Sequence, residues 1–141
     1  MNGRRILLIE DGKTYAKLAS LLLRRIGCEV TWAATAAEGL RLAREEAPDL
    51  VLMDINLPDM DGFTAVRTLR QDPRAARIPV VALTADQVSN ASEFEAARTA
   101  GFDRYSEKPI QEDAFRALVE SALDRGTAPT SNTATPAPNP D

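Results

Sequence analysis

One short apolar segment constrains the fold of this chain more than any other. Residues 50–53 are Leu-Val-Leu-Met, an unbroken apolar run that ends at Asp54. A continuous run of this length is typical of a strand covered on both faces, as in the centre of a parallel sheet. The Pro- and Gly-containing residues 55–62 predict a loop after it, from which the next helix begins. Asp54 is therefore expected at the carboxyl end of a buried strand, where open α/β sheets bind ligands.

The rest of the chain alternates in the same way between strand and helix patterns. Apolar or alternating stretches predict four further strands, at residues 5–9, 28–33, 78–83 and 102–107. Helical spacing predicts five helices, at residues 14–26, from 35 towards Pro48, and at 63–71, 91–100 and 112–122. Thr35 followed by Glu38 forms a capping box that predicts the start of the second helix. Five strands alternating with five helices predict an α/β fold with a doubly wound, five-stranded parallel sheet. Edge-like patterns in the second and fifth strands agree with the flavodoxin-like order 2-1-3-4-5.

Individual side chains can also be placed by these patterns. In the helix at 14–26, the apolar residues at helical spacing predict its buried face: Tyr15, Leu18, Ala19, Leu22 and Ile26. Alternation along residues 28–33 predicts that Trp32 packs on an edge strand and that Cys28 is a half-buried, inert thiol.

Composition excludes several classes of function. The 141 residues suggest one domain, and a net charge of −4 without a basic block argues against nucleic-acid binding. No apolar run approaches the ~18 residues of a membrane span, and the start of the chain does not resemble a signal peptide. One cysteine excludes an intrachain disulfide, and the absence of histidine excludes histidine-based catalysis and histidine metal ligands. We therefore expect a cytoplasmic protein without a membrane or nucleic-acid partner.

The predicted sheet brings separated polar residues to one edge. Glu10 and Asp11 follow the first strand, Asp54 ends the third, Thr84 ends the fourth and Lys108 follows the fifth. Two unit charges ~4 Å apart repel by roughly 4 kcal/mol at an effective dielectric constant near 20, so three carboxylates call for a cation. Mg²⁺ suits carboxylates, waters and a phosphoryl oxygen. A lysine and a hydroxyl beside such a site favour phosphoryl transfer.

Four segments of the chain resemble the motifs of two-component response-regulator receiver domains. They are ILLIED, LVLMDINLPDMDGF, VVALTA and EKPI, and they stand in the family's order over residues 4–125. The resemblance implies that Asp54 is phosphorylated, that Thr84 and Lys108 bind the phosphoryl group and that Tyr105 is an aromatic switch residue. It also implies a magnesium site whose ligands are Glu10 (directly or through water), Asp11, Asp54 and the main-chain carbonyl of Asn56.

Three further details come from the same resemblance. It implies a cis bond between Lys108 and Pro109. It also implies that Asn56 and Asp86 flank the path of a water molecule that removes the phosphoryl group. The sequence departs from the commoner pattern at Gly12-Lys13, where many relatives carry an uncharged polar or bulky residue. An extra cation there would ease carboxylate repulsion and so alter metal affinity.

Taken together, the residues and the resemblance lead us to expect a receiver domain at residues 1–125, similar to CheY-like and DivK-like single-domain response regulators. Its phosphohistidine donor must be another protein, a sensor histidine kinase or a histidine phosphotransfer protein, because the chain has no histidine. The receiver would catalyse only its own phosphorylation and dephosphorylation. Its output would be altered binding of a downstream protein through the fourth helix, fifth strand and fifth helix.

Alternative interpretations remain open at this point. Residues 126–141 are rich in Pro, Thr and Ala, which predicts a disordered tail or a linker. The chain could thus be a receiver cut from a longer response regulator or hybrid histidine kinase. A haloacid-dehalogenase-like phosphatase also uses a strand-end aspartate and Mg²⁺. Those enzymes carry a DxDxT motif, whereas residues 54–58 read Asp-Ile-Asn-Leu-Pro. A purely structural receiver is disfavoured because every pocket residue is present.

Overall fold

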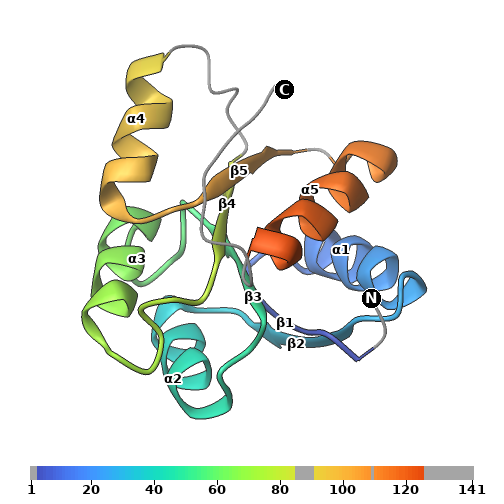
Figure 1. Ribbon diagram of the computed structural model, residues 1–141, viewed down its shortest axis with the longest axis horizontal. Helices are drawn as coiled ribbons and strands as arrows, with labels where there is room; N and C mark the ends of the chain where they lie inside the picture. Colours follow the sequence, from blue (N-terminus) through green and yellow to red (C-terminus); the bar gives the residue numbers. More distant parts are fainter. Residues whose placement is uncertain (1–2, 85–90, 109, 126–141) are drawn as a thin grey trace.

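The computed structural model describes residues 3–84, 91–108 and 110–125, which form one parallel sheet flanked by helices (Figure 1). The sheet has five strands in the order β2-β1-β3-β4-β5, so the predicted fold and strand order are confirmed. Strands and helices alternate along the chain: β1 (Arg5–Ile9), α1 (Lys13–Arg25), β2 (Glu29–Ala33), α2 (Ala36–Glu46), β3 (Leu50–Asp54), α3 (Gly62–Gln71), β4 (Val80–Thr84), α4 (Ala91–Ala100), β5 (Arg104–Glu107) and α5 (Glu112–Arg125).

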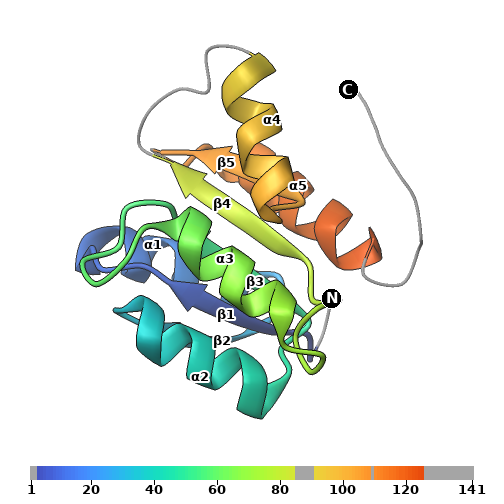
Figure 2. The ribbon, with the colours of Figure 1, turned by 90° about the vertical axis from the view of Figure 1, so that its left-hand side faces the viewer.

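Two apolar cores lie on opposite faces of the sheet. Helices α1 and α5 cover one face, and α2, α3 and α4 cover the other (Figure 2). The pleat of the strands divides their side chains between these cores, because successive residues point to opposite faces. In β1, Ile6 and Leu8 pack under α1 and α5, whereas Leu7 and Ile9 pack under α2 and α3. The continuous apolar runs of the central strands follow from this two-sided burial.

The buried face of α1 differs from the prediction. Leu18 is 43 % exposed, whereas Ala16, Ala19, Leu22 and Leu23 are buried. Five of the seven residues from Leu18 to Arg24 are apolar, so several stripes on this helix satisfy helical spacing. The stripe that includes two alanines faces the sheet, which lets α1 pack close to it.

Cys28 also differs from the prediction, because it lies deeper than the half-buried position expected from the sequence. It is only 4 % exposed and belongs to the core beneath α1 and α5. The chain turns at Gly27, whose φ of 91° is in the left-handed region that glycine adopts readily. This turn directs the next residue inward, and burial raises the pKa of the Cys28 thiol. The group therefore remains a thiol rather than a thiolate.

A half-buried arginine joins three segments at the end of the sheet opposite the predicted site. Arg70, near the end of α3, donates to main-chain carbonyls before β4 and before β5, and pairs with a carboxylate. Its partners are the carbonyl of Gly101 at 3.0 and 2.8 Å, that of Ala76 at 3.0 Å, that of Ile78 at 2.6 Å and the carboxylate of Asp103 at 2.8 Å. This network fixes α3 against both connections, which helical spacing alone does not predict.

Several sequence predictions concern residues outside the described parts of the chain. These are the tail at 126–141, Asp86 and the bond between Lys108 and Pro109. Among the described residues, no helix combines the length and the apolar character needed to cross a membrane.

Candidate active site at the carboxyl edge of the sheet

The parallel sheet places the predicted site residues at one edge. Asp54 is the last residue of β3 and Thr84 the last of β4. The register pairs Ile9 with Met53, so Glu10 and Asp11 leave β1 beside Asp54. On the other side, Thr84 pairs with Glu107, and the main-chain N–H of Lys108 donates to the carbonyl of Thr84 at 2.8 Å. Five residues distant in the sequence are thereby gathered.

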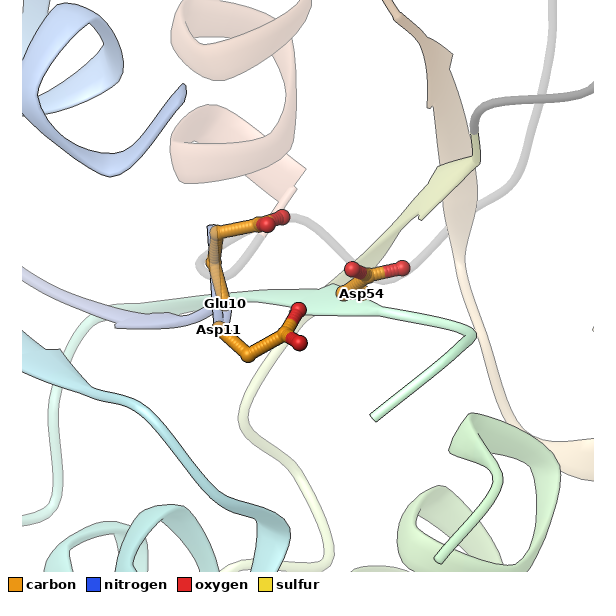
Figure 3. A group of neighbouring side chains, drawn as sticks. All are labelled: Glu10, Asp11 and Asp54. Atoms are coloured by element: carbon orange, nitrogen blue, oxygen red, sulfur yellow. The ribbon is translucent and has the colours of Figure 1, made fainter. Parts of the chain in front are cut away.

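Three carboxylates form a compact cluster at this edge. One oxygen from each of Glu10, Asp11 and Asp54 lies within 4.8 Å of the others. In Figure 3 the carboxylate groups point into the same space, with Glu10 and Asp11 leaving adjacent positions and Asp54 facing them. Glu10 and Asp54 are buried and Asp11 is exposed. An all-oxygen set of this kind, open on one side, fits a hard divalent cation that keeps some of its waters.

Lys108 supplies the positive charge nearest to this cluster. Its ammonium group lies 2.7 Å from Oε1 of Glu10 and 3.2 Å from Oδ2 of Asp54. Burial acts to lower the pKa of Lys108, but the hydrogen bond to Glu10 and the charge of Asp54 outweigh burial and raise it. Lys108 is therefore a stable cation that offsets the carboxylate repulsion.

Glu10 occupies the innermost position of the cluster. Burial raises the pKa of its carboxyl group, although the hydrogen bonds from Lys108 and from the main-chain N–H of Gly12 act in the opposite direction. The Gly12 N–H lies 2.8 Å from Oε2, and a Cβ at Gly12 would lie at the same distance from that oxygen. The glycine that departs from the commoner pattern thus leaves room for the carboxylate of Glu10. Lys13 is exposed at the start of α1, and among the described residues no ion pair joins it to the cluster.

The loop after Asp54 is held in a compact shape. The N–H of Asn56 donates to Oδ1 of Asp54 at 2.9 Å, and Asn56 bridges to Asp61 across the loop. Gly62 is packed so tightly that a Cβ there would lie 2.7 Å from the Cα of Ile55. Asp61 caps α3 by accepting from the N–H of Thr64 at 2.8 Å, as its place before Gly62 predicts. The close backbone approach explains the glycine at this position.

Asp59 connects this loop to a different helix. Its carboxylate accepts from the N–H groups of Ala36 and Ala37, at 2.8 and 2.9 Å, at the start of α2. These two donors lower the pKa of Asp59. The predicted cap of α2 is present as well, because the hydroxyl of Thr35 accepts from the N–H of Glu38 at 3.2 Å. The sequence indicated only this local cap, since the Asp59 contact spans 23 residues.

Two aromatic residues border the acidic cluster. Lys108 lies over the ring of Tyr15, 4.5 Å from its centroid, a cation–π geometry that holds the lysine. Burial, and then the charges of Glu10 and Asp54, raise the pKa of Tyr15. Trp32 donates its indole N–H to the carbonyl of Glu10 at 2.6 Å. Sequence reasoning assigned Tyr15 and Trp32 to packing alone, because helical and strand spacing do not indicate such contacts.

Thr84 and Tyr105, the two remaining predicted residues, lie on the neighbouring strands β4 and β5. Thr84 is 6 % exposed at the end of β4. Tyr105 stands beside Ala82 in β5 and is partly buried against the core under α2, α3 and α4.

This arrangement can now be compared with known proteins. Residues 6–120 match the family model of the response regulator receiver domain. The chain belongs to the receiver domain family. Apart from the first residue of β1, the match covers all five strands and the cluster at their carboxyl edge. Membership argues against the dehalogenase-type alternative, whose nucleophile motif the chain also lacks.

Relatives of this receiver domain differ in length. It is 37 % identical over 123 residues to the transcriptional regulatory protein AfsQ1 of Streptomyces coelicolor, and the match covers 86 % of this chain but 52 % of AfsQ1. It is 35 % identical to the polar-differentiation response regulator DivK of Brucella ovis, covering 84 % of this chain and 94 % of DivK. The chain thus spans about half of one relative and nearly all of another.

A solved structure bears on the metal. The receiver domain of the sensor histidine kinase PA1611 from Pseudomonas aeruginosa is 30 % identical, with a TM-score of 0.78 over 86 % of this chain and 98 % of that one. That domain holds a magnesium ion in its active-site cleft. The acidic cluster of the present chain has the oxygen ligands that such an ion requires.

Proposed function

We propose that this chain is a phosphoacceptor of two-component signalling, and that Asp54 receives a phosphoryl group from the phosphohistidine of a partner protein. The observation that carries the proposal is that the ammonium group of Lys108 forms two ion pairs, at 2.7 Å to Glu10 and at 3.2 Å to Asp54. It places a cation beside the proposed nucleophile, and a third carboxylate lies within 4.8 Å. Phosphoryl transfer depends mainly on such positioning and charge neutralisation.

The proposed cofactor is Mg²⁺. Its ligands would be Asp11, Asp54 and the main-chain carbonyl of Asn56, with Glu10 binding directly or through water. When bound, the ion would neutralise charge that develops on the phosphoryl oxygens. The chain contributes the rigid donor set: Asn56 is tied to Asp54 through its N–H at 2.9 Å, and Glu10 is buried.

The transfer itself needs little covalent chemistry from the protein. A carboxylate oxygen of Asp54 attacks phosphorus, the O–P bond forms, and the P–N bond to the donor histidine breaks. The electron pair of that bond remains on the imidazole nitrogen, which takes a proton. Lys108 and the hydroxyl of Thr84 would bind the transferred oxygens, since both lie at the same edge of the sheet as Asp54.

The phosphoryl group would then be lost to water. Water attacks phosphorus, inorganic phosphate leaves and the Asp54 carboxylate is restored. In this cycle the chain acts only on itself and turns over no separate metabolite.

The proposed partners follow from this cycle. The donor is a sensor histidine kinase or a histidine phosphotransfer protein in the cytoplasm. A downstream protein reads the state of the face formed by α4, β5 and α5. The half-length match to AfsQ1 favours a second arrangement, in which the receiver at residues 1–125 belongs to a longer protein and residues 126–141 are a linker.

Labelling by a small phosphodonor such as acetyl phosphate tests the acceptor. We expect Mg²⁺-dependent incorporation that is abolished by chelation and by Asp54→Asn. The matched control is Asp59→Asn, which removes an exposed carboxylate of the same loop and should retain labelling at Asp54. Labelling of the Asp54→Asn variant at the wild-type level would refute the assignment.

A further inference from the structure

Trp32 reaches the acidic cluster from the edge strand. The register of β1 and β2 pairs it with Leu8, yet its indole N–H donates to the carbonyl of Glu10, two residues further along, at 2.6 Å. The side chain is 43 % exposed. More than half of its surface is covered, so Trp32 also packs on the edge strand, and the hydrogen bond to the Glu10 carbonyl is its polar contact with the acid pair.

This hydrogen bond continues the ladder between β1 and β2 beyond the last paired residue. The N–H of Glu10 donates to the carbonyl of Ala33 at 3.0 Å, and its carbonyl accepts from the indole. Both peptide units that flank Glu10 are therefore held by β2. The carbonyl of Glu10 and the N–H of Asp11 belong to one planar unit, so fixing that carbonyl also restricts the orientation of Asp11.

A fixed main chain at Glu10 and Asp11 favours metal binding. Without a cation, the carboxylates of Glu10, Asp11 and Asp54 repel each other across less than 4.8 Å. Lys108 offsets part of this repulsion at Glu10 and Asp54, but its ion pairs do not include Asp11. A backbone anchor next to Asp11 keeps that exposed ligand in place, so less conformational freedom is lost when a cation binds.

We propose that Trp32 is a positioning residue for the magnesium site, acting through its hydrogen bond to the main chain of the acid pair. The proposal rests on the proposed function, because it assumes that this cluster binds Mg²⁺. It assigns to the edge strand a role in ligand geometry that is separate from packing. By linkage, Mg²⁺ binding also alters the environment of the Trp32 indole.

The chain has one tryptophan, so a spectroscopic test reports on this residue alone. Titration of the full chain with Mg²⁺ should shift the single indole ¹H–¹⁵N resonance and change tryptophan fluorescence, with the same midpoint as calorimetric binding. An indole resonance that does not move while Mg²⁺ binds would overturn the proposal.

Substitution separates positioning from packing. Trp32→Phe should weaken Mg²⁺ binding about two- to tenfold, the range expected for one net hydrogen bond. Leu21→Ala is the matched control, since Leu21 is a 53 % exposed apolar residue on α1. The Mg²⁺ affinity of this variant should equal that of the wild type. A role in packing alone would lower the melting temperature of the metal-free Trp32→Phe protein and leave Mg²⁺ affinity unchanged.

Tryptophan analogues remove the hydrogen bond with almost no change of shape. Full replacement of Trp32 by an analogue with sulfur in place of the indole N–H should weaken Mg²⁺ binding as Trp32→Phe does. The analogue therefore tests the hydrogen bond even if the Trp32→Phe variant does not fold. A fluorinated tryptophan that keeps the N–H should restore wild-type affinity. Equal affinities for the sulfur analogue and the wild type would overturn the role of Trp32 only. Failure of the wild-type protein to bind Mg²⁺ would overturn the proposed function as well.

Discussion

At the scale of the residue, the site is governed by how charges are paired in a partly buried space. Glu10 and Asp54 are 2 % and 5 % exposed, and both face the ammonium group of Lys108. A lysine in this position acts in two ways. It stabilises the metal-free state by neutralising the carboxylates, and it competes with any cation that binds them.

Removing that lysine should therefore separate the two effects. Without Mg²⁺, we expect Lys108→Met to lose up to about 3 kcal/mol in the free energy of unfolding, because two buried carboxylates lose their partner. Added Mg²⁺ should stabilise the variant more than the wild type, since the ion no longer competes with an ammonium group. Thermal denaturation with and without Mg²⁺ measures both effects. Lys17→Met, at an exposed position on α1, is the control. Equal Mg²⁺-dependent shifts in variant and wild type would contradict the competition.

At the scale of the element, helix starts position the loops of the site. The first turn of α2 receives an uncharged cap from Thr35 and a charged one from Asp59. The charged cap comes from the loop that follows Asp54, so the start of α2 and the carboxyl edge of the sheet are connected. This contact ties the loop at residues 55–62, which contains one proline and one glycine, to the start of α2.

The stability that the charged cap contributes should depend on pH. Hydrogen bonds from Ala36 and Ala37 lower the pKa of Asp59 below its ordinary 3.8. The contribution is therefore fully present above that pH and is lost as the pH falls through the lowered pKa. At pH 7, Asp59→Ala should cost on the order of 1 kcal/mol. Chemical denaturation should show this cost shrinking as the pH falls below 3.8 and wild-type Asp59 becomes protonated.

Thr35→Ala is the matched control for this experiment. It removes an uncharged acceptor from the same helix start, so its cost should not change over that pH range. If the cost of Asp59→Ala stayed constant with pH, the carboxylate charge would not be the source of the stabilisation.

At the scale of the whole molecule, the site and the proposed output face are connected through β4 and β5. Thr84 ends β4 at the site, and Tyr105 stands in β5 beside Ala82. Tyr105 is partly buried against the core under α2, α3 and α4. A movement of Thr84 towards a phosphoryl group would change the space available to this ring, which would alter the face made by α4, β5 and α5.

Tyr105→Ala tests this coupling. We expect the variant to bind Mg²⁺ and accept a phosphoryl group at Asp54 nearly as the wild type does. It should lose most of the amide chemical-shift changes on α4, β5 and α5 when a beryllofluoride mimic is added. A shift from 1:99 to 99:1 needs roughly 5.5 kcal/mol of differential binding, so we expect a graded response in the wild type. A full response in the variant would assign Tyr105 to packing.

What the sequence determined by itself are the features that depend on local pattern. Strands β1, β3 and β4 end at Ile9, Asp54 and Thr84. Burial on both faces of the sheet requires apolar side chains along these strands, and the polar residues of the site begin where the apolar runs stop. Because parallel strands end at one edge, this pattern sufficed to bring Glu10, Asp11, Asp54, Thr84 and Lys108 together.

Only the tertiary structure decided which face of α1 is buried and which polar residues distant in the sequence are hydrogen-bonded. The apolar face of α1 could be read in several ways, and only packing against the sheet chose Ala16 and Leu23 over Leu18. The bond from Trp32 to Glu10 spans 22 residues. No periodicity encodes it, because it depends on how two strands align and on the reach of one side chain. Such contacts set the geometry of the site, whereas hydrophobic pattern sets its location.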